Sequence, residues 1–250
     1  MRIVVIGGSG LIGSRLVKLL LDRGHEPIAA SRATGINSLT GEGLTEALKG
    51  TSVAIDVTNA PSREDAAVMN FFETATRNLL TYEAAAGVSH HVALSVVGVE
   101  RMPESGYLRA KLSQENLIRA ASIPYSIVRA TQFYESVSSI ADFATEGNQV
   151  HLPPVFFQPM AAGDVAAAIG EIAVGAPTDG TVEIGGPETL RLDEAARQSL
   201  ATRGDSREVI TDPHGRYYDI AVKEYTLLPG DGARLGTTLF EDWLAQGNWR

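Results

Sequence analysis

The sequence predicts an α/β protein built on a doubly wound, mainly parallel sheet with a small C-terminal lobe. In the first half of the chain, short β-branched runs alternate with longer stretches of helical periodicity. The β-branched runs are almost continuously apolar, which is typical of parallel strands covered on both faces. Repeated strand–helix–strand units imply right-handed crossovers, and together these observations predict the doubly wound arrangement.

Each element of the first half follows from its local pattern. The expected strands are Arg2–Ile6, Pro27–Ser31, Ser52–Val57, Val88–Ser95 and Tyr125–Arg129, with Ile36–Leu39 as a further short edge strand. The expected helices are Leu11–Arg23, Leu44–Lys49, Glu64–Ala86 and Tyr107–Ala121. Three of these helices are followed by a glycine suited to the C′ position, namely Gly24, Gly50 and Gly87.

The pattern is less regular in the second half. Helices are expected at Asp164–Val174, Leu192–Thr202 and Thr238–Ala245, a strand at Thr181–Ile184, and an irregular segment at Asp212–Gly232. Thr237 or Thr238 suits the cap of the last helix, and Asp164 is expected to cap its own helix. We therefore expect residues 1–150 to form the core and residues 151–250 to form a small substrate-binding lobe, packed on the core and belonging to the same domain.

Composition excludes several classes of protein. The chain has 250 residues, no cysteine, and 21 Lys and Arg residues against 30 Asp and Glu residues, for a net charge of −9. Disulfides and thiolate chemistry are thereby excluded, and nucleic acid and anionic membranes are poor candidates for partners. Neither a targeting segment nor a membrane span is expected, so a cytoplasmic location is predicted, with the oligomeric state left open. The scattered histidines, including the pair His90-His91, do not predict a metal site.

A glycine-rich turn follows the first strand and opens the first helix: Gly7-Gly8-Ser9-Gly10-Leu11-Ile12-Gly13. Gly7 permits the tight turn, Gly10 permits a pyrophosphate to approach the backbone, and Gly13 permits close packing of helix on strand. The free N–H groups of the helix then face the anion. Strand, turn and helix in this order are the context that makes a dinucleotide site specific rather than a chance run of glycines.

Two further loops at the carboxyl edge of the sheet are candidates for cofactor contacts. Ser31 and Arg32 follow the second strand, where a carboxylate would select NAD(H) by binding the ribose 2′-hydroxyl. An arginine beside a hydroxyl suits a 2′-phosphate instead, so NADP(H) is preferred over NAD(H). Thr58, Asn59 and Ala60 follow the strand Ser52–Val57, and they either line the ribose or serve only as turn residues.

Tyr107, Lys111 and Ser95 form the candidate catalytic set. Tyr107 and Lys111 are spaced i, i+4 at the start of a helix, whereas seven tyrosines and four lysines in 250 residues give roughly 0.1 such pairs by chance. A nearby ammonium group favours the phenolate form of a tyrosine, so Tyr107 can serve as general acid or base. Lys111 would tune Tyr107 and hold the nicotinamide ribose, and Ser95 would orient the substrate oxygen. The alternative is that the three residues have no catalytic role. Tyr107 would then be a half-exposed side chain, Lys111 a solvated lysine, and Ser95 an ordinary residue at the end of a strand.

These motifs resemble the atypical, NmrA-like branch of the short-chain dehydrogenases/reductases, which are NAD(P)-binding Rossmann-fold proteins. The resemblance covers residues 1–190 and rests on the glycine turn, Ser95, the stretch Tyr107–Lys111, and two later stretches, Ile123–Arg129 and Pro159–Ala166. Two positions depart from the family pattern: Asn37 stands where relatives often have Asp, and Ala130 where many have Pro. Some members of this branch lack the Tyr and Lys and act as cofactor sensors, whereas this chain has both.

Residues and resemblance together predict an NADP(H)-dependent oxidoreductase that acts on a small carbonyl, alcohol or quinone-like substrate. A non-catalytic NADP(H) sensor is the alternative, followed by an epimerase or dehydratase with bound cofactor. Several aromatic residues of the second half either line an apolar substrate pocket or belong to the core: Phe133, Tyr134, Phe156, Phe157, Tyr217 and Tyr218.

Overall fold

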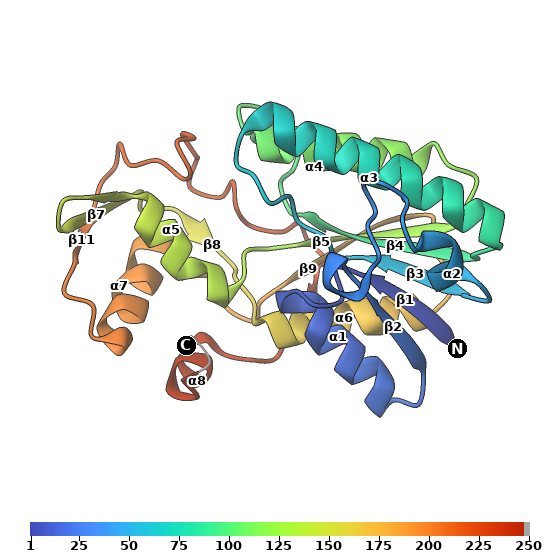
Figure 1. The fold of residues 1–250 in the computed structure, drawn as a ribbon. Helices are drawn as coiled ribbons and strands as arrows, with labels where there is room; N and C mark the ends of the chain where they lie inside the picture. The colour runs from blue at the N-terminus through green and yellow to red at the C-terminus, as the bar shows by residue number, and fades with distance from the viewer. Residues whose placement is uncertain (248–250) are drawn as a thin grey trace. The chain divides into compact units, whose positions relative to one another are not determined.

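A seven-stranded sheet organises the computed structural model, which describes residues 1–247, with the strand order β12-β9-β5-β4-β3-β1-β2 (Figure 1). The strands are β1 Arg2–Ile6, β2 Glu26–Ala30, β3 Val53–Asp56, β4 His90–Val96, β5 Tyr125–Ala130, β6 Thr145–Glu146, β7 Gln149–Leu152, β8 Phe156–Phe157, β9 Gly180–Gly185, β10 Leu190–Arg191, β11 Glu208–Thr211 and β12 Arg234–Leu235. The helices are α1 Leu11–Asp22, α2 Leu44–Leu48, α3 Asp65–Ala86, α4 Gly106–Arg119, α5 Val137–Phe143, α6 Ala162–Val174, α7 Leu192–Arg203 and α8 Phe240–Ala245. Two 3-10 turns, Arg32–Thr34 and Tyr134–Ser136, complete the set.

The chain divides into two compact units. The first unit comprises Met1–Arg129 and Val165–Val182, and the second comprises Ala130–Asp164 and Glu183–Arg250. The sequence suggests a single division at residue 150, whereas the chain leaves the first unit at residue 130 and returns to it at residue 165. Within residues 1–247, no helix combines the length and the apolarity required to cross a membrane.

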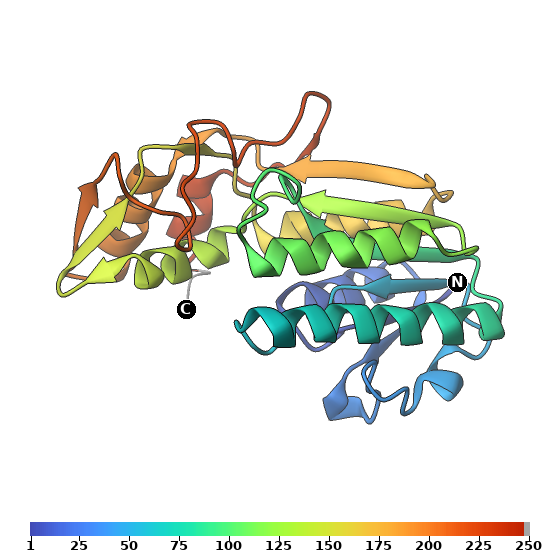
Figure 2. The same ribbon diagram turned by 90° about the horizontal axis from the view of Figure 1, so that it is seen from above.

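The first unit has the predicted doubly wound arrangement. Strand β1 pairs in parallel with both β2 and β3, and β3 pairs in parallel with β4. Helices α3 and α4 lie side by side over one face of the sheet, while α1 and α6 cover the other face (Figures 1 and 2). Because both faces are covered, β1 and β3 are buried almost throughout, which explains their continuous apolar runs.

The segment expected as an edge strand, Ile36–Leu39, is irregular, so that prediction is wrong. Its apolar residues serve another purpose: Ile36 packs on the core cluster around Val4 and Leu79. Its carbonyl groups are satisfied by a side chain rather than by a neighbouring strand, since Asn78 Nδ2 donates to Ser38 O at 2.8 Å and to Leu39 O at 2.9 Å. An apolar run satisfied in this way needs no sheet partner.

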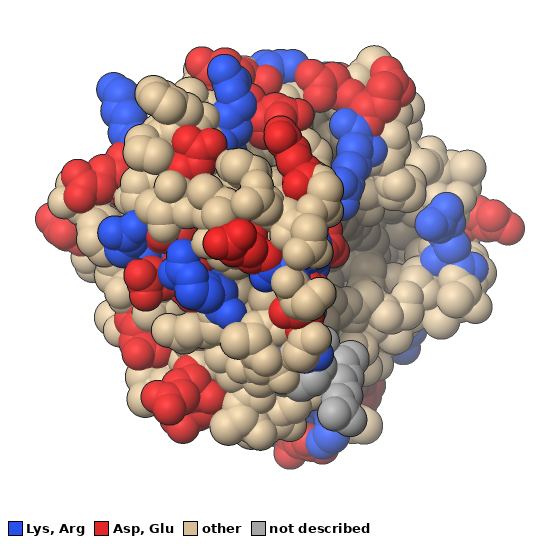
Figure 3. Space-filling model, turned by 90° about the vertical axis from the view of Figure 1, so that its left-hand side faces the viewer, with Lys and Arg blue, Asp and Glu red and all other residues tan. Residues whose placement is uncertain are grey.

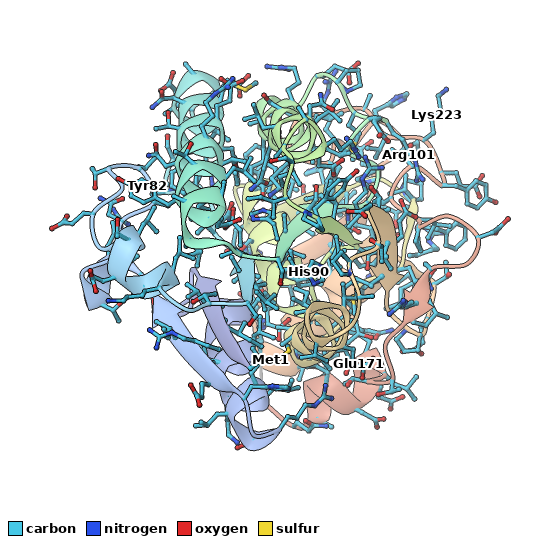
Figure 4. All side chains as sticks on the ribbon, turned by 90° about the vertical axis from the view of Figure 1, so that its right-hand side faces the viewer. Met1, Tyr82, His90, Arg101, Glu171 and Lys223 are labelled. Carbon is cyan, nitrogen blue, oxygen red and sulfur yellow. The ribbon has the colours of Figure 1, made fainter. Side chains whose placement is uncertain are left out.

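The adjacent histidines of β4 point to opposite faces, as neighbours in a strand must. His90, labelled in Figure 4, has Nε2 at 2.9 Å from Ser126 Oγ, and burial lowers the pKa of its ring. His91 Nδ1 lies 2.8 Å from Glu83 Oε2 of α3, and both side chains are buried. Burial opposes the charged form of His91, but the Glu83 carboxylate outweighs it and raises the pKa of the ring. The two histidines therefore serve separate packing layers.

The second unit contains a three-stranded sheet, β11-β7-β6, and the short pair β10-β8. Acidic and basic side chains are interspersed on the face shown in Figure 3. Within the second unit, Arg207 forms ion pairs with Asp142 at 2.8 Å and with Asp205 at 2.7 Å. Residues 212–232 contain no helix or named strand, as the sequence predicts.

The aromatic residues of the second unit separate into core and surface groups. Tyr134 and Phe157 are fully buried, and the Tyr134 hydroxyl donates to Thr238 O at 2.8 Å. Phe156 stacks on the exposed Tyr225, with ring centroids 5.8 Å apart. Further contacts between rings join Tyr217 to Tyr218 and Tyr218 to Phe143. At least two of the aromatic residues left open by the sequence are therefore core residues.

Asp164 and the last helix correct two capping predictions. Helix α6 already begins at Ala162, and the Asp164 carboxylate accepts from Thr237 N and Thr238 N at 2.9 Å and from Thr238 Oγ1 at 3.0 Å. Asp164 thus fastens the C-terminal segment rather than capping its own helix. Helix α8 begins at Phe240 without a side-chain cap, so neither threonine caps it.

Candidate functional site

The glycine-rich turn is held against the ends of the two strands that flank β1. Gly7 N donates to Ala30 O of β2 at 2.9 Å. On the other side, a Cβ atom at Gly7 would lie 3.0 Å from Val57 O, and Gly7 has φ +84°. Only glycine adopts this conformation without strain in so little space. The turn therefore brings the ends of β1, β2 and β3 to one place.

Close packing explains the other glycines of the turn. A Cβ atom at Gly13 would lie 2.1 Å from Gly7 O, and one at Gly8 would lie 2.7 Å from Ala29 Cα. Sequence reasoning missed the second requirement, because nothing local reveals how near β2 lies to Gly8. The N-cap Gly10 provides no side-chain cap, and the first turn of α1 carries no acidic residue. The N-terminus of α1 is therefore favourable for an anion.

The segment after β2 offers a positive group and no carboxylate. Arg32 is exposed at the start of the 3-10 turn Arg32–Thr34, and its guanidinium forms no ion pair with any residue from 1 to 247. The Ser31 hydroxyl oxygen is buried. Asn37, at the position where relatives often have Asp, uses its Oδ1 to accept from Leu39 N at 3.0 Å. The neutral Asn37 leaves Arg32 as the charged group of this loop.

The loop after β3 is ordered by Asp56. Thr58 N and Thr58 Oγ1 both donate to Asp56 Oδ1, at 2.9 Å and 2.7 Å. Asn59 is exposed and accepts from Ala60 N through its own Oδ1, while Ala60 packs on the cluster around Phe72. Thr58 and Ala60 therefore have structural partners, and Asn59 is the most accessible of the three predicted contacts.

Tyr107 and Lys111 lie in the first two turns of α4 and share one face of the helix, as their spacing predicts. The helix is capped by Ser105, whose hydroxyl accepts from Leu108 N at 3.2 Å. The Tyr107 ring packs edge-on against the ring of Phe72 in α3, with centroids 5.8 Å apart. Lys111 Nζ lies 4.4 Å from the centroid of the same ring. Phe72 thus joins the two residues, and sequence reasoning missed it.

Lys111 is buried rather than solvated. It is 2% exposed, and its ammonium group donates to Leu94 O of β4 at 2.8 Å and to Gln114 Oε1. Burial lowers the pKa of Lys111 to about 8, although Asp56 and Glu115 favour the charged form. The alternative of a solvated lysine is therefore wrong. At neutral pH the ammonium form predominates, and because the group is shielded from water its field acts strongly on neighbouring groups.

Gln114 connects Lys111 to the end of β3. Its Nε2 donates to Asp56 Oδ2 at 2.9 Å, while its Oε1 accepts from Lys111. All three side chains are buried. Asp56 therefore serves both the loop after β3 and the helix that carries Lys111.

Ser95 belongs to a separate buried network. Its hydroxyl donates to Glu115 Oε1 at 2.5 Å, and Arg129 donates to both oxygens of Glu115 at 2.9 Å and 2.7 Å. Burial opposes ionisation of Glu115, but hydrogen bonds from Arg129 and Ser95 lower the pKa of the carboxyl. The exposed Glu100 extends the network to the surface, with its Oε1 at 2.6 Å from Arg129 Nη2. Ser95 is 3% exposed, so its predicted contact with substrate stays a prediction.

The carboxyl edge of the sheet therefore brings together the glycine turn, the loop after β3, and the start of α4. The contacts that join them are Gly7 with Val57, and the chain from Asp56 through Gln114 to Lys111. Sequence reasoning missed Asp56, Gln114 and Glu115, because the bond between Gln114 and Asp56 spans 58 residues and the bond between Ser95 and Glu115 spans 20. The one sequence signal that could have indicated Gln114 is its position, three residues after Lys111 and on the same face of the helix.

Comparison with known proteins identifies the family and the fold. A family model described as NAD(P)H-binding matches residues 7–173, which include the glycine turn, Tyr107 and Lys111. The chloroplastic divinyl chlorophyllide a 8-vinyl-reductase of Cucumis sativus is 29% identical over 226 residues, which cover 74% of this chain and 53% of that protein. The photosystem II assembly factor Ycf39 of a Synechocystis species is 22% identical over 151 residues, which cover 55% of this chain and 46% of that protein. The chain thus spans about half the length of the curated relatives that it matches.

Solved structures of similar fold cover nearly the whole chain. MoeE5 in complex with UDP-glucose and NAD has a TM-score of 0.74 at 21% identity, and the match covers 100% of this chain and 98% of that one. UDP-glucose 4-epimerase from Thermotoga maritima has a TM-score of 0.75 at 18% identity, with 98% and 96% covered. These likenesses support the Rossmann-type fold alone. Because the family model covers well over half of the sequence, the chain belongs to the NAD(P)H-binding family, a group of oxidoreductase-like Rossmann-fold proteins.

Proposed function

We propose that the protein is an NADP(H)-dependent oxidoreductase that transfers hydride to or from a small carbonyl, alcohol or quinone-like substrate. The observation that carries the proposal is the buried ammonium of Lys111, which shares the ring of Phe72 with Tyr107. A lysine buried near a tyrosine at the strand ends favours proton transfer by the phenol. The uncapped first turn of α1 and the close packing of Gly13 fit a bound dinucleotide.

Hydride transfer and proton transfer would involve different groups. When bound, the nicotinamide supplies or accepts the hydride. Tyr107 would donate the proton of its hydroxyl group to the substrate oxygen in reduction and remove that proton in oxidation. The Lys111 ammonium would stabilise the resulting phenolate and hold the nicotinamide ribose. Since the Ser95 proton lies on the bond to Glu115, Ser95 would orient a carbonyl oxygen only after its hydroxyl turns away from that carboxylate.

Tyr107→Phe tests the assignment of the acid and base. NADPH consumption is followed at the nicotinamide absorbance band against a panel of carbonyl and quinone substrates. We expect turnover to fall by about 100-fold or more, since general acid–base catalysis contributes on that scale, with NADPH affinity within about twofold of the parent. Tyr82→Phe, the same change on α3, is the matched control and should leave turnover unchanged. Equal turnover in the Tyr107→Phe protein would refute the mechanism.

Arg32→Glu tests the choice of cofactor. A carboxylate there would repel the 2′-phosphate and could bind the free hydroxyl, so we expect the ratio of NADPH to NADH affinity to fall by about tenfold or more. Arg77→Glu, an exposed change of equal charge on α3, serves as the control for net charge. An unaltered ratio in the Arg32→Glu protein would show that Arg32 does not select the cofactor.

A non-catalytic NADP(H) sensor is the second candidate. It is favoured by the engagement of Ser95 by Glu115 and of Lys111 by Leu94 O and Gln114. A protein that binds NADPH but consumes none across the panel would support the sensor. Turnover of a sugar nucleotide without net NADPH consumption would instead indicate an epimerase or dehydratase.

A further inference from the structure

We propose that Asp56 and Gln114 are positioning residues for Lys111: Asp56 fixes the orientation of the Gln114 amide, and the amide oxygen then holds the ammonium group. The inference rests on the proposed function only for the cofactor and the phenol that the ammonium serves. The arrangement itself is a property of the described side chains and is tested separately from turnover.

Asp56 determines which end of the Gln114 amide faces Lys111. One carboxylate oxygen, Oδ1, is occupied by Thr58 N and Thr58 Oγ1 at 2.9 Å and 2.7 Å. The other oxygen, Oδ2, accepts from Gln114 Nε2 at 2.9 Å. A carboxylate has no donor, so the NH2 end of Gln114 must face Asp56 and the oxygen must face Lys111. The lysine ammonium has only donors, so this is the orientation in which both bonds form.

The anchor is fixed in turn by the loop after β3. Because both oxygens of Asp56 are engaged and the side chain is 2% exposed, the carboxylate has little freedom to rotate. Lys111 is also held by Leu94 O at 2.8 Å and by the face of Phe72 at 4.4 Å. Strands β3 and β4 and helices α3 and α4 thus all contribute to the placement of one ammonium group.

Nearby charges also affect the protonation of Lys111. The charged groups that act on Lys111 are Asp56 from β3 and Glu115 from α4, and both favour the ammonium form against burial. Helix α3 contributes the uncharged ring of Phe72. Asp56 also favours the charged form of His91, so removal of its charge reaches both groups. Glu115 is already neutralised by Arg129, which leaves Asp56 as the less compensated carboxylate.

The chain permits a direct measurement because it contains four lysines, at positions 18, 49, 111 and 223. Lysine labelled with 13C at Cε gives one set of signals per residue, and Lys111→Met assigns the signal of interest. In the parent we expect the Lys111 signal to titrate near pH 8, well below the exposed lysines. In Asp56→Asn we expect its midpoint to fall by about one pH unit, because a nearby opposite charge is lost.

Gln114→Met removes the bond without changing the formal charge. We expect the Lys111 midpoint to fall in this variant as well, and NADPH affinity in both variants to fall by about tenfold at pH 7. Thr76→Val, at a buried position of α3, is the control and should leave the midpoint and the affinity unchanged. Circular dichroism and thermal melting establish that each variant is folded.

The positioning of Lys111 and its role toward the cofactor have separate readouts. If the Lys111 midpoint stays within about 0.2 pH units of the parent in both folded variants, Asp56 and Gln114 do not position the ammonium. If the midpoints move but NADPH affinity does not, positioning is supported and the role of Lys111 toward the cofactor is overturned. If the parent itself fails to bind NADPH, the proposed function is wrong while the midpoints still decide the arrangement.

Discussion

Gly13→Ala is the most severe test of the glycine turn. The added Cβ atom would lie 2.1 Å from Gly7 O, 2.8 Å from Gly7 C and 2.8 Å from Gly8 Cα. All three are backbone atoms, so the clash cannot be relieved by the rotation of a side chain. The backbone of the glycine turn must instead shift away from helix α1. Overpacking of this kind costs about 1–3 kcal/mol. For a chain of 250 residues that corresponds to a melting temperature lower by roughly 2–12 °C.

The same displacement moves the first N–H groups of α1, which face the proposed pyrophosphate. We therefore expect NADPH affinity, measured by calorimetry, to fall at least about tenfold, which is 1.4 kcal/mol. Gly163→Ala is the matched control, because Gly163 is also helical, has open space around its Cβ position, and lies in α6. That change should stabilise the protein by up to about 1 kcal/mol and leave binding unaltered. A Gly13→Ala protein with parental melting temperature and affinity would refute the reasoning.

Three further predictions concern ionisable side chains elsewhere in the molecule. Lys111 has a depressed folded pKa of about 8 against 10.5, so stability should rise by roughly 3 kcal/mol between pH 8 and 10.5 relative to Lys111→Met, as measured by urea unfolding. His91 has a raised folded pKa, so its stabilising pair with Glu83 is present below pH 6.5 and lost as pH rises through the folded pKa; Glu83→Gln should abolish that dependence. Asp164→Ala removes an acceptor of three hydrogen bonds from residues 237 and 238 and should cost about 2 kcal/mol, whereas a loss below 0.5 kcal/mol would contradict its fastening role.

Most of the fold could be predicted because its signals are local. A strand buried on both faces is apolar along its whole length, and β1 begins and ends where its sequence predicts. The prediction of a strand at Ile36–Leu39 is wrong because the apolar side chains and the carbonyl groups of this segment interact with different parts of the fold. Ile36 packs on the core, and Asn78, some forty residues later, satisfies the carbonyl groups of residues 38 and 39. A pattern read along the chain cannot show so distant a donor.

In the candidate site, too, the features that depend on local spacing could be predicted, and those that depend on distant contacts could not. The i, i+4 relation of Tyr107 and Lys111 is written in one helix, and so it could be predicted. The burial of Lys111 could not, because it depends on contacts with Leu94 of β4 and Phe72 of α3, which lie far from it along the chain. Likewise, Ser95 lies one residue before the end of β4, close to where the sequence predicts, but its hydrogen-bond partner is Glu115, twenty residues later on α4. Local spacing identifies candidates, while tertiary contacts determine their protonation and orientation.

The division of the chain has a consequence for its synthesis. The first unit needs Val165–Val182, which carries most of α6 and the start of β9, so it cannot be completed until residue 182 has left the ribosome. By then the whole insert Ala130–Asp164 has already emerged and must wait for its own partners beyond residue 183. A fragment cut at residue 150 would lack both α6 and β9. Neither unit can therefore be obtained by a single truncation, and the order of emergence allows the first unit to be completed before the second, which needs the chain beyond Glu183.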